Sequence, residues 1–184
     1  MAKFILSAND YGSTIKKTIL NTLSNDEDRA LAEMQSEKEL TAYLSGKYDL
    51  VALLPTIYFW ALSSAYAAES IVYQYKAGKD LFFKAKVAIA ADTVLEDGAN
   101  WEAIDDPRDP LIKEILIDLT LYRTHIRLAP NQIPETRVQK RDDQIKFLRM
   151  VSRGDVIVDW PLIDPLNDNG SVTWGSKEKF IKDY

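Results

Sequence analysis

The sequence contains no cysteine and only one histidine, His125, among its 184 residues. Without cysteine the chain forms no disulfide, holds no metal through thiolates and has no thiol nucleophile. The histidine has no second histidine to complete a metal site, and no carboxylate follows it at three or four residues. We therefore expect His125 to be a packed or interface residue, with a role as a general base as the open alternative.

Motifs for phosphates, calcium and secretion are also missing. No glycine-rich loop matches the dinucleotide or P-loop patterns. The stretch LNDNG at 166–170 resembles a calcium loop only faintly, because Pro165 and Ser176 would occupy its first and last ligand positions. The first residues, MAKFILSANDYG, lack the apolar length and cleavage site of a signal peptide. These absences favour synthesis in the cytoplasm and a protein without a cofactor.

The composition is that of one globular domain, with room for a small insert. Apolar residues make up 46% of the chain and charged residues 28%, which suffices for a core. The formal net charge of -5 argues against a general affinity for nucleic acid. A passage through which DNA slides without sticking stays compatible with this charge.

One uncharged segment, Leu50 to Ala68, has about the length of a membrane span. Pro55, Ser63 and Ser64 interrupt it, and no cluster of lysine and arginine flanks it. We interpret it as a buried or subunit-facing segment, and a membrane-associated protein is the alternative.

Capping signals predict two helices in the first part of the chain. Ser7 and Asp10 form a capping box for a helix over about 11–23. The pair Ser24-Asn25 opens a second helix whose first turn is acidic, and Gly46 is placed to end it.

Proline and glycine delimit two further helices. Asp109 caps the first, Pro110 takes its first position, and Pro130 ends it. Pro134 opens the second, which lasts until Gly154. Apolar residues recur at helical spacing in both, so we expect them to pack as an αα-hairpin across the turn APNQIP.

The middle of the chain is harder to interpret. Ile57 to Tyr75 has the length of a helix, but its β-branched and aromatic content leaves the assignment open. Leu81 to Phe83 and Val87 to Ala90 resemble two short strands, and Trp101 marks a return to buried structure.

Together these patterns predict a mainly α fold. We expect a helical domain made of 1–74 and 106–155, with a small β-rich insert over 75–105. An extended C-terminal arm, 156–184, follows the helices. Its many apolar residues suggest docking on a neighbouring subunit or partner, anchored by Trp160 and Trp174.

The charged residues near the C-terminal hairpin show no catalytic pattern. Asp142 and Asp143 are adjacent, so on a helix they point roughly 100° apart and cannot share a proton. The basic residues of the same segment favour a salt-bridged face or subunit contact over a DNA footprint; they are Arg137, Lys140, Arg141, Lys146, Arg149 and Arg153. The four tryptophans are more typical of core or interface anchors than of sugar-stacking platforms.

One long stretch resembles a known family. The order LIDLTLYRTHIRLAPNQIPETRVQKRDDQIKFLRMVSRGDV is similar to the C-terminal helical hairpin of the Mu-like head–tail connector family of tailed phages, in the versions of Bacteroides-type hosts. FILSANDYGSTI at 4–15 resembles the family's capped opening helix, and AYLSGKYDL at 42–50 the end of its second helix. Gln144 and Phe147 depart from the family pattern. The middle of the chain matches only loosely.

The resemblance implies a structural virion protein at the neck, assembled in the host cytoplasm. Such proteins form rings, usually dodecameric, beneath the portal protein; they extend the DNA channel and seat the tail or further neck proteins. It implies no catalysis, no cofactor and no metal. Expected contacts with neighbouring subunits or partners involve Tyr122, His125, Arg127, Arg137, Arg141, Trp160 and Trp174. The alternatives are a membrane-associated protein, a carbohydrate-binding module, and a hydrolase using His125.

Overall fold

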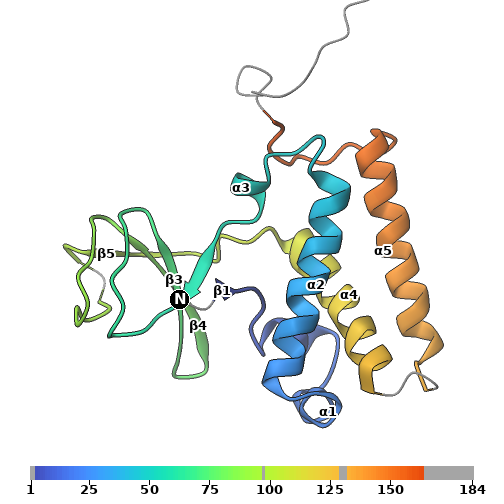
Figure 1. Cartoon of the computed structure of the whole chain (residues 1–184), viewed down its shortest axis with the longest axis horizontal. Helices are drawn as coiled ribbons and strands as arrows, with labels where there is room; N and C mark the ends of the chain where they lie inside the picture. The colour runs from blue at the N-terminus through green and yellow to red at the C-terminus, as the bar shows by residue number, and fades with distance from the viewer. Residues whose placement is uncertain (1–2, 97, 129–131, 164–184) are drawn as a thin grey trace, which may run out of the picture.

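The computed structural model describes residues 3–96, 98–128 and 132–163, which form two lobes joined side by side (Figure 1). One lobe consists of helices and the other is a five-stranded mixed sheet. With 46% helix and 17% strand among the described residues, the fold is mixed α and β, so the prediction of a mainly α protein is wrong. The error arose largely between residues 57 and 76, where short aromatic and β-branched runs form strands.

The helical lobe begins with the predicted capping box. The backbone N–H of Ser7 donates to Asp10 Oδ2 at 2.7 Å, and the N–H of Asp10 donates to Ser7 Oγ at 3.1 Å. The box introduces only a 3-10 turn, η1 (Asp10–Ser13), before α1 (Lys17–Leu23). The single helix expected over 11–23 is therefore divided into two pieces.

The longer helices begin and end near the predicted residues. In α2 (Asp26–Leu44), Asn25 accepts a bond from the N–H of Asp28. In α4 (Pro110–Leu128), Asp109 accepts bonds from the first free N–H groups. The last, α5 (Glu135–Arg153), ends at Gly154, whose φ of +87° is the left-handed conformation that glycine adopts without strain.

α4 packs against both α2 and α5, and α4 and α5 run antiparallel (Figure 1). The predicted αα-hairpin is thus present, although part of its connecting turn lies outside the described residues. A single apolar core joins these helices to η1, to α1 and to the short α3 (Leu50–Leu53). Its fully buried members include Tyr11, Leu40, Leu44, Ile115, Leu119, Leu121, Leu148 and Val151.

The sheet follows the order β1-β2-β3-β4-β5. Its strands are β1 (Lys3–Phe4), β2 (Ile57–Phe59), β3 (Ile71–Lys76), β4 (Lys79–Ala85) and β5 (Trp101–Ile104). Only β2 and β3 are parallel. Three of the strands thus lie partly or wholly outside the range 75–105, so the β structure draws on much more of the chain than the expected insert.

β3 and β4 form a hairpin whose two loop residues, Ala77 and Gly78, both have positive φ. This geometry matches the twist of the flanking strands. The strand expected at Val87 to Ala90 is wrong, because only Ile89 pairs there, in a single bridge to Tyr66.

Alternation along the strands builds two small cores on opposite faces of the sheet. Tyr73 pairs with Phe82 and belongs to the core that contains Phe4 and Ile57. The neighbouring pair of Val72 and Phe83 belongs to the other core, which surrounds the fully buried Trp101. The return to buried structure at Trp101 was predicted correctly.

The described part of the C-terminal arm packs back on the helical lobe. The N–H of Asp49 donates to the carbonyl of Pro161 at 2.9 Å, and the N–H of Ile163 donates to that of Lys47 at 3.1 Å. Trp160 is buried edge-on against the ring of Tyr48, with centroids 5.5 Å apart. The side chain expected to anchor a partner is therefore used inside its own chain, while Trp174 lies outside the described residues.

The uncharged segment Leu50 to Ala68 divides into α3, a turn at Pro55 and strand β2. Among the helices that the structure describes, none is long and apolar enough to cross a membrane.

Candidate functional site

His125 lies buried on α4, and its Nδ1 is 2.7 Å from the carbonyl oxygen of Leu121. Because a carbonyl oxygen only accepts, the imidazole carries its proton on Nδ1 and donates a hydrogen bond to Leu121, in the preceding turn of α4. Within the described ranges, no group of three or more histidine, aspartate or glutamate side chains is placed to bind a metal. The hydrogen bond of His125 in the described part of the chain is therefore to its own helix.

Tyr122 and Arg141 meet between α4 and α5, where the guanidinium lies over the phenol ring at 5.3 Å. Arg141 also contacts Glu39 of α2 at 3.5 Å and Asp142 at 2.9 Å. Two residues expected at a subunit contact therefore join three helices of the same chain.

Arg127 and Arg137 also have partners inside the chain. Arg127 pairs with Asp28 at 2.7 Å, between α4 and the first turn of α2. Arg137 lies 4.0 Å from the buried carboxylate of Asp118, which Lys140 approaches at 3.6 Å. Burial lowers the pKa of Arg137, and the Asp118 charge opposes that shift.

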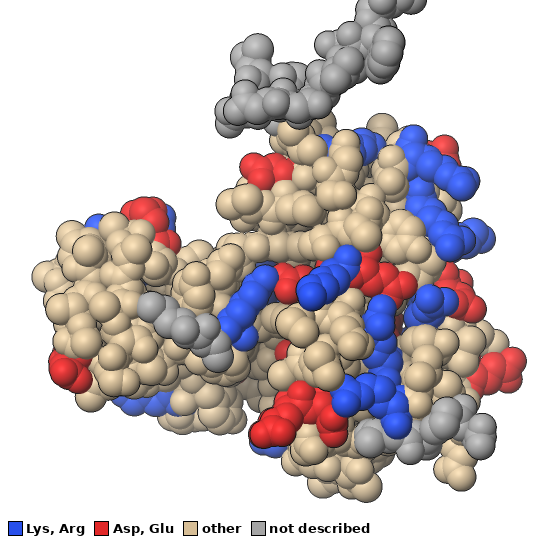
Figure 2. Space-filling view, in the orientation of Figure 1, with Lys and Arg blue, Asp and Glu red and all other residues tan. Residues whose placement is uncertain are grey.

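The remaining basic residues of α5 have no such partners. We call Lys146, Arg149 and Arg153 the basic face; all three are exposed, and no acidic residue in the described ranges forms an ion pair with them. They border a shallow groove of about 390 Å³ with Ile145 and Met150 among its lining residues. Figure 2 shows blue side chains gathered over α5.

The lobe junction is built around Arg108, a residue that the sequence patterns did not single out. Its guanidinium donates to Asp106 at 2.8 Å, to Asp10 Oδ2 at 2.7 Å and to the carbonyl of Ile5 at 2.9 Å. Burial disfavours the charge, but the two carboxylates outweigh it and raise the pKa of Arg108. Arg108 thus fastens the start of α4 to the first turn of the chain.

The sheet lobe completes this junction. The rings of Phe4 and Phe82 lie 4.8 and 5.1 Å from the Arg108 guanidinium carbon, a cation–π arrangement. Asp80 accepts bonds from Ser7 Oγ at 2.7 Å and from the Tyr73 hydroxyl at 2.8 Å. Burial, followed by the bond to Asp80, raises the pKa of Tyr73 well above its usual value. Hydrogen bonds and cation–π contacts therefore connect the two lobes.

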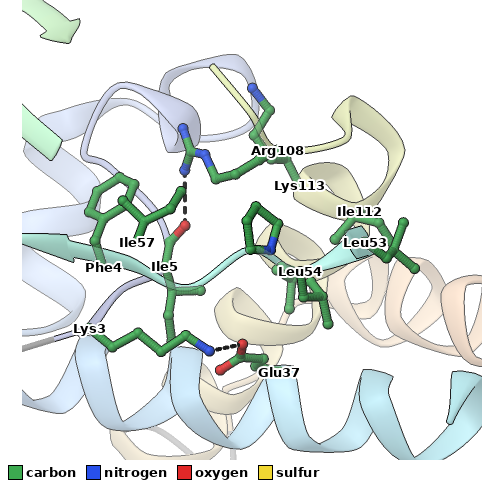
Figure 3. Close-up of a pocket in the computed structure, with 12 residues that line it drawn as sticks. Lys3, Phe4, Ile5, Glu37, Leu53, Leu54, Ile57, Arg108, Ile112 and Lys113 are labelled. Carbon is green, nitrogen blue, oxygen red and sulfur yellow. Dashed lines mark hydrogen bonds and ion pairs between the residues drawn. The ribbon is translucent and has the colours of Figure 1, made fainter. Parts of the chain in front are cut away.

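Beside Arg108 lies a narrow apolar crevice, shown in Figure 3. Leu53, Leu54, Ile112 and Leu116 line it, and the Lys3–Glu37 ion pair lies beside it. Its volume of about 30 Å³ holds roughly one water molecule. Ligand pockets usually exceed ~300 Å³, so the crevice is too small for a substrate.

A wider groove of about 480 Å³ separates α2 from the sheet lobe. Glu33 contributes to its helical wall, and exposed Phe59 and Tyr75 contribute to the opposite wall. Burial raises the pKa of Glu33 to about 7, although the Tyr11 hydroxyl, 2.7 Å away, and Arg29 favour its charged form. Asp26 and Ser7 also line this groove, but Asp26 pairs with Arg29 and Ser7 Oγ donates to Asp80, so neither is bonded to Glu33.

The tryptophans offer no sugar-binding platform that the structure can describe. Trp101 and Trp160 are buried in separate cores. Trp60 is partly buried, with its indole N–H enclosed.

Comparisons with protein-family models, curated proteins and solved structures found no match.

Proposed function

We propose that this protein is a structural virion component, the subunit of a head–tail adaptor ring beneath the portal of a tailed phage. In this role it extends the DNA channel and provides a seat for the tail or a further neck protein. The proposal includes no catalysis and no cofactor.

The observation that carries the proposal concerns the three stretches that resemble the connector family. Residues 4–15, 42–50 and 116–156 are far apart in sequence, yet their apolar residues share one core. Leu6 and Tyr11 of the first stretch, Leu44 and Tyr48 of the second, and Leu121 and Leu148 of the third are all buried there. The stretches that carry the resemblance therefore belong to one packed unit, as a family domain requires.

The lobe junction supports a structural role. All the N–H groups of the Arg108 guanidinium donate to Asp10, to Asp106 or to a backbone carbonyl. Arg108 therefore has no free donor for a substrate. Such a network fixes one lobe against the other. A ring subunit needs this rigidity because small errors in subunit angle accumulate around a closed ring.

Native mass spectrometry and negative-stain microscopy test the proposal. The purified chain is measured alone over a range of concentrations, and again with a portal protein of a tailed phage. We expect a closed ring with a central channel, seated on the portal in the mixture. A chain that stays monomeric at every concentration, and does not bind the portal, would contradict the proposal.

A further inference from the structure

The basic face of α5 is unusual within this acidic chain. α5 contains six lysines and arginines against three acidic residues, whereas the chain as a whole carries a charge of -5. Arg137, Lys140 and Arg141 of its first half are matched by carboxylates of the same chain. In the second half, no described carboxylate forms an ion pair with Lys146, Arg149 or Arg153, although Asp142 lines the same groove.

This arrangement has a cost in the isolated chain. Lys146 and Arg149 are three residues apart, and Arg149 and Arg153 are four apart, so like charges are neighbours on the helix surface. Repulsion between such neighbouring like charges destabilises a helix. The groove beside them is lined by the half-buried Met150, the buried Ile145 and Asp142, so a partner there meets a small apolar surface bordered mainly by positive charge.

A surface of opposite character lies at the far end of the sheet lobe. We call Leu62, Asp92, Val94 and Glu96 the tip patch; the side chains of Leu62 and Val94 are 45% and 61% exposed. Asp92 and Glu96 are also exposed and have no ion pair within the described ranges. The tip patch is therefore apolar with an acidic border.

The tip patch is held in a defined shape. The N–H of Asp92 donates to the carbonyl of Leu62 at 2.7 Å, which ties its two loops together. Leu95 is buried in the core around Trp101 and fixes the loop between β4 and β5. A surface that is ordered before binding loses little entropy when a partner docks.

The two surfaces lie at opposite ends of the molecule. The loop between β4 and β5 is at the far left in Figure 1, and α5 is at the far right. Figure 2 shows red side chains, with blue ones beside them, on the outer part of the sheet lobe, and a group of mainly blue side chains over the upper part of α5. Because they face away from one another, the surfaces cannot meet within one chain.

We propose that the basic face and its groove bind the tip patch of a second copy of this chain, in a head-to-tail contact. Leu62 and Val94 then enter the groove beside Ile145 and Met150, and the acidic border meets Lys146, Arg149 and Arg153. An apolar centre with a charged border is the usual anatomy of a protein interface. Head-to-tail contacts generate rings when the rotation closes.

Nucleic acid is the other polyanion that the basic face could attract. The apolar residues of the groove and the net negative charge of the chain both oppose binding of a phosphate backbone. Titration of duplex DNA is therefore included in the test as a competing outcome.

The test uses two variants of the full chain, each altered at one surface. The first carries Lys146→Glu, Arg149→Glu and Arg153→Glu; the second carries Leu62→Ser, Val94→Ser and Glu96→Lys. The control reverses three exposed lysines elsewhere, Lys16→Glu, Lys38→Glu and Lys79→Glu. Sedimentation velocity measures self-association, and circular dichroism checks that each variant is folded.

Each variant alone should self-associate about tenfold or more weakly than the unaltered chain. In the first variant the reversed basic face repels the acidic border of the tip patch. In the second variant the tip patch loses its apolar side chains and one of its acidic residues. An equimolar mixture of the two should form dimers that grow no further. In such a dimer the intact tip patch of one variant occupies the intact basic face of the other. The control should assemble like the unaltered chain, and raised salt should weaken assembly.

The contact proposed here refines the ring proposal, and the two fail differently. Rings that form equally well in both variants overturn the head-to-tail contact and leave the ring. Open filaments that both variants abolish uphold the contact and overturn the ring. A mixture that stays monomeric, or a DNA affinity that only the first variant loses, overturns the contact.

Discussion

The two lobes are stabilised in different ways. The helical lobe has a single core, to which η1, α2, α4 and α5 all contribute. The sheet lobe has two separate small cores on opposite faces, and one of them contains Phe4 from the edge strand. Small cores bury less apolar surface for each ordered residue, so they depend more on neighbouring structure.

This difference gives the junction its importance. The core that contains Phe4 faces Arg108, whose guanidinium lies against Phe4 and Phe82 while its donors bind Asp10 and Asp106. Arg108, a charged residue just before α4, thus covers one side of this core of the sheet lobe. We expect the sheet lobe to be the less stable of the two once this contact is lost.

Arg108→Met should produce the largest effect, a loss of about 3–5 kcal/mol in the free energy of unfolding. The change leaves Asp10 and Asp106 without their cation in a partly buried site, and the aromatic contact disappears. Chemical denaturation should change from one transition to two, with the sheet lobe unfolding first. Hydrogen exchange by mass spectrometry assigns each transition to a lobe.

Arg149→Met is the matched control, because Arg149 is exposed and has no described ion pair. Its effect on monomer stability should stay below about 0.5 kcal/mol. A single, unchanged transition in Arg108→Met would show that the lobes do not depend on this junction.

Leu148→Ala tests the single core of the helical lobe. Leu148 is fully buried, and its truncation should cost about 2–5 kcal/mol through lost burial and a residual cavity. Exchange should accelerate together in α2, α4 and α5, because all three contribute to this core. Leu31→Ala, at a partly exposed position of α2, should cost less than about 1 kcal/mol. Acceleration confined to α5 would contradict a shared core.

Glu33 should make the stability of the helical lobe depend on pH. Burial raises its folded pKa to about 7 from 4.5, so between these pH values the folded chain holds a proton that the unfolded chain has lost. The contribution of Glu33 therefore decreases as pH rises through this window. Glu33→Gln removes the ionisation and should gain roughly 2 kcal/mol over the unaltered chain at pH 8, with little difference near pH 4.

Thermal unfolding at a series of pH values measures this difference. Tyr11→Phe removes a hydrogen bond that favours the charged form of Glu33, so it should make the decrease with pH steeper. A difference between Glu33→Gln and the unaltered chain that is the same at pH 4 and pH 8 would show that Glu33 ionises as it does in the unfolded state.

Gly154→Ala should have the smallest effect, a loss of about 1 kcal/mol, since alanine at a φ of +87° is strained. The control is Gly46→Ala, also placed after a helix. Gly46 has no positive φ and no atom within 4 Å of an added Cβ, so its substitution should be close to neutral. Chemical denaturation measures the free energy of unfolding of both variants. Equal losses for Gly154→Ala and Gly46→Ala would contradict the explanation from the positive φ of Gly154.

The helical lobe was largely predictable because its signals are local. Asn25, Asp109 and Gly154 mark helix ends through contacts with residues two to four positions away. The one local error, a continuous helix over 11–23, arose because the capping box of Ser7 and Asp10 also fits a 3-10 turn. Capping chemistry indicates where a turn begins but does not determine how far it continues.

The sheet lobe and the junction depend on contacts that no local pattern encodes. Strand β2 has three residues and pairs in parallel with β3 across a long connection. Arg108 meets Asp10, which is 98 residues earlier in the chain. In the sequence, the segment DDPRDP indicated only a boundary before α4. The basic run of α5 was visible, but which of its members find partners depends on the placement of Asp118 and Glu39.

The chain passes between the lobes three times, after β1, before β2 and after β5. Synthesis on the ribosome follows the same order, so β1 is made some fifty residues before its partner β2. At roughly 5–20 residues per second, the strand waits several seconds unpaired. The sheet is complete once β5 has emerged, while the core of the helical lobe still lacks α4 and α5. Arg108 follows directly after β5, so the junction can close on a finished sheet before the last two helices exist. A nascent chain halted once Arg108 has emerged from the ribosome would therefore display a formed sheet and an unfinished helical core.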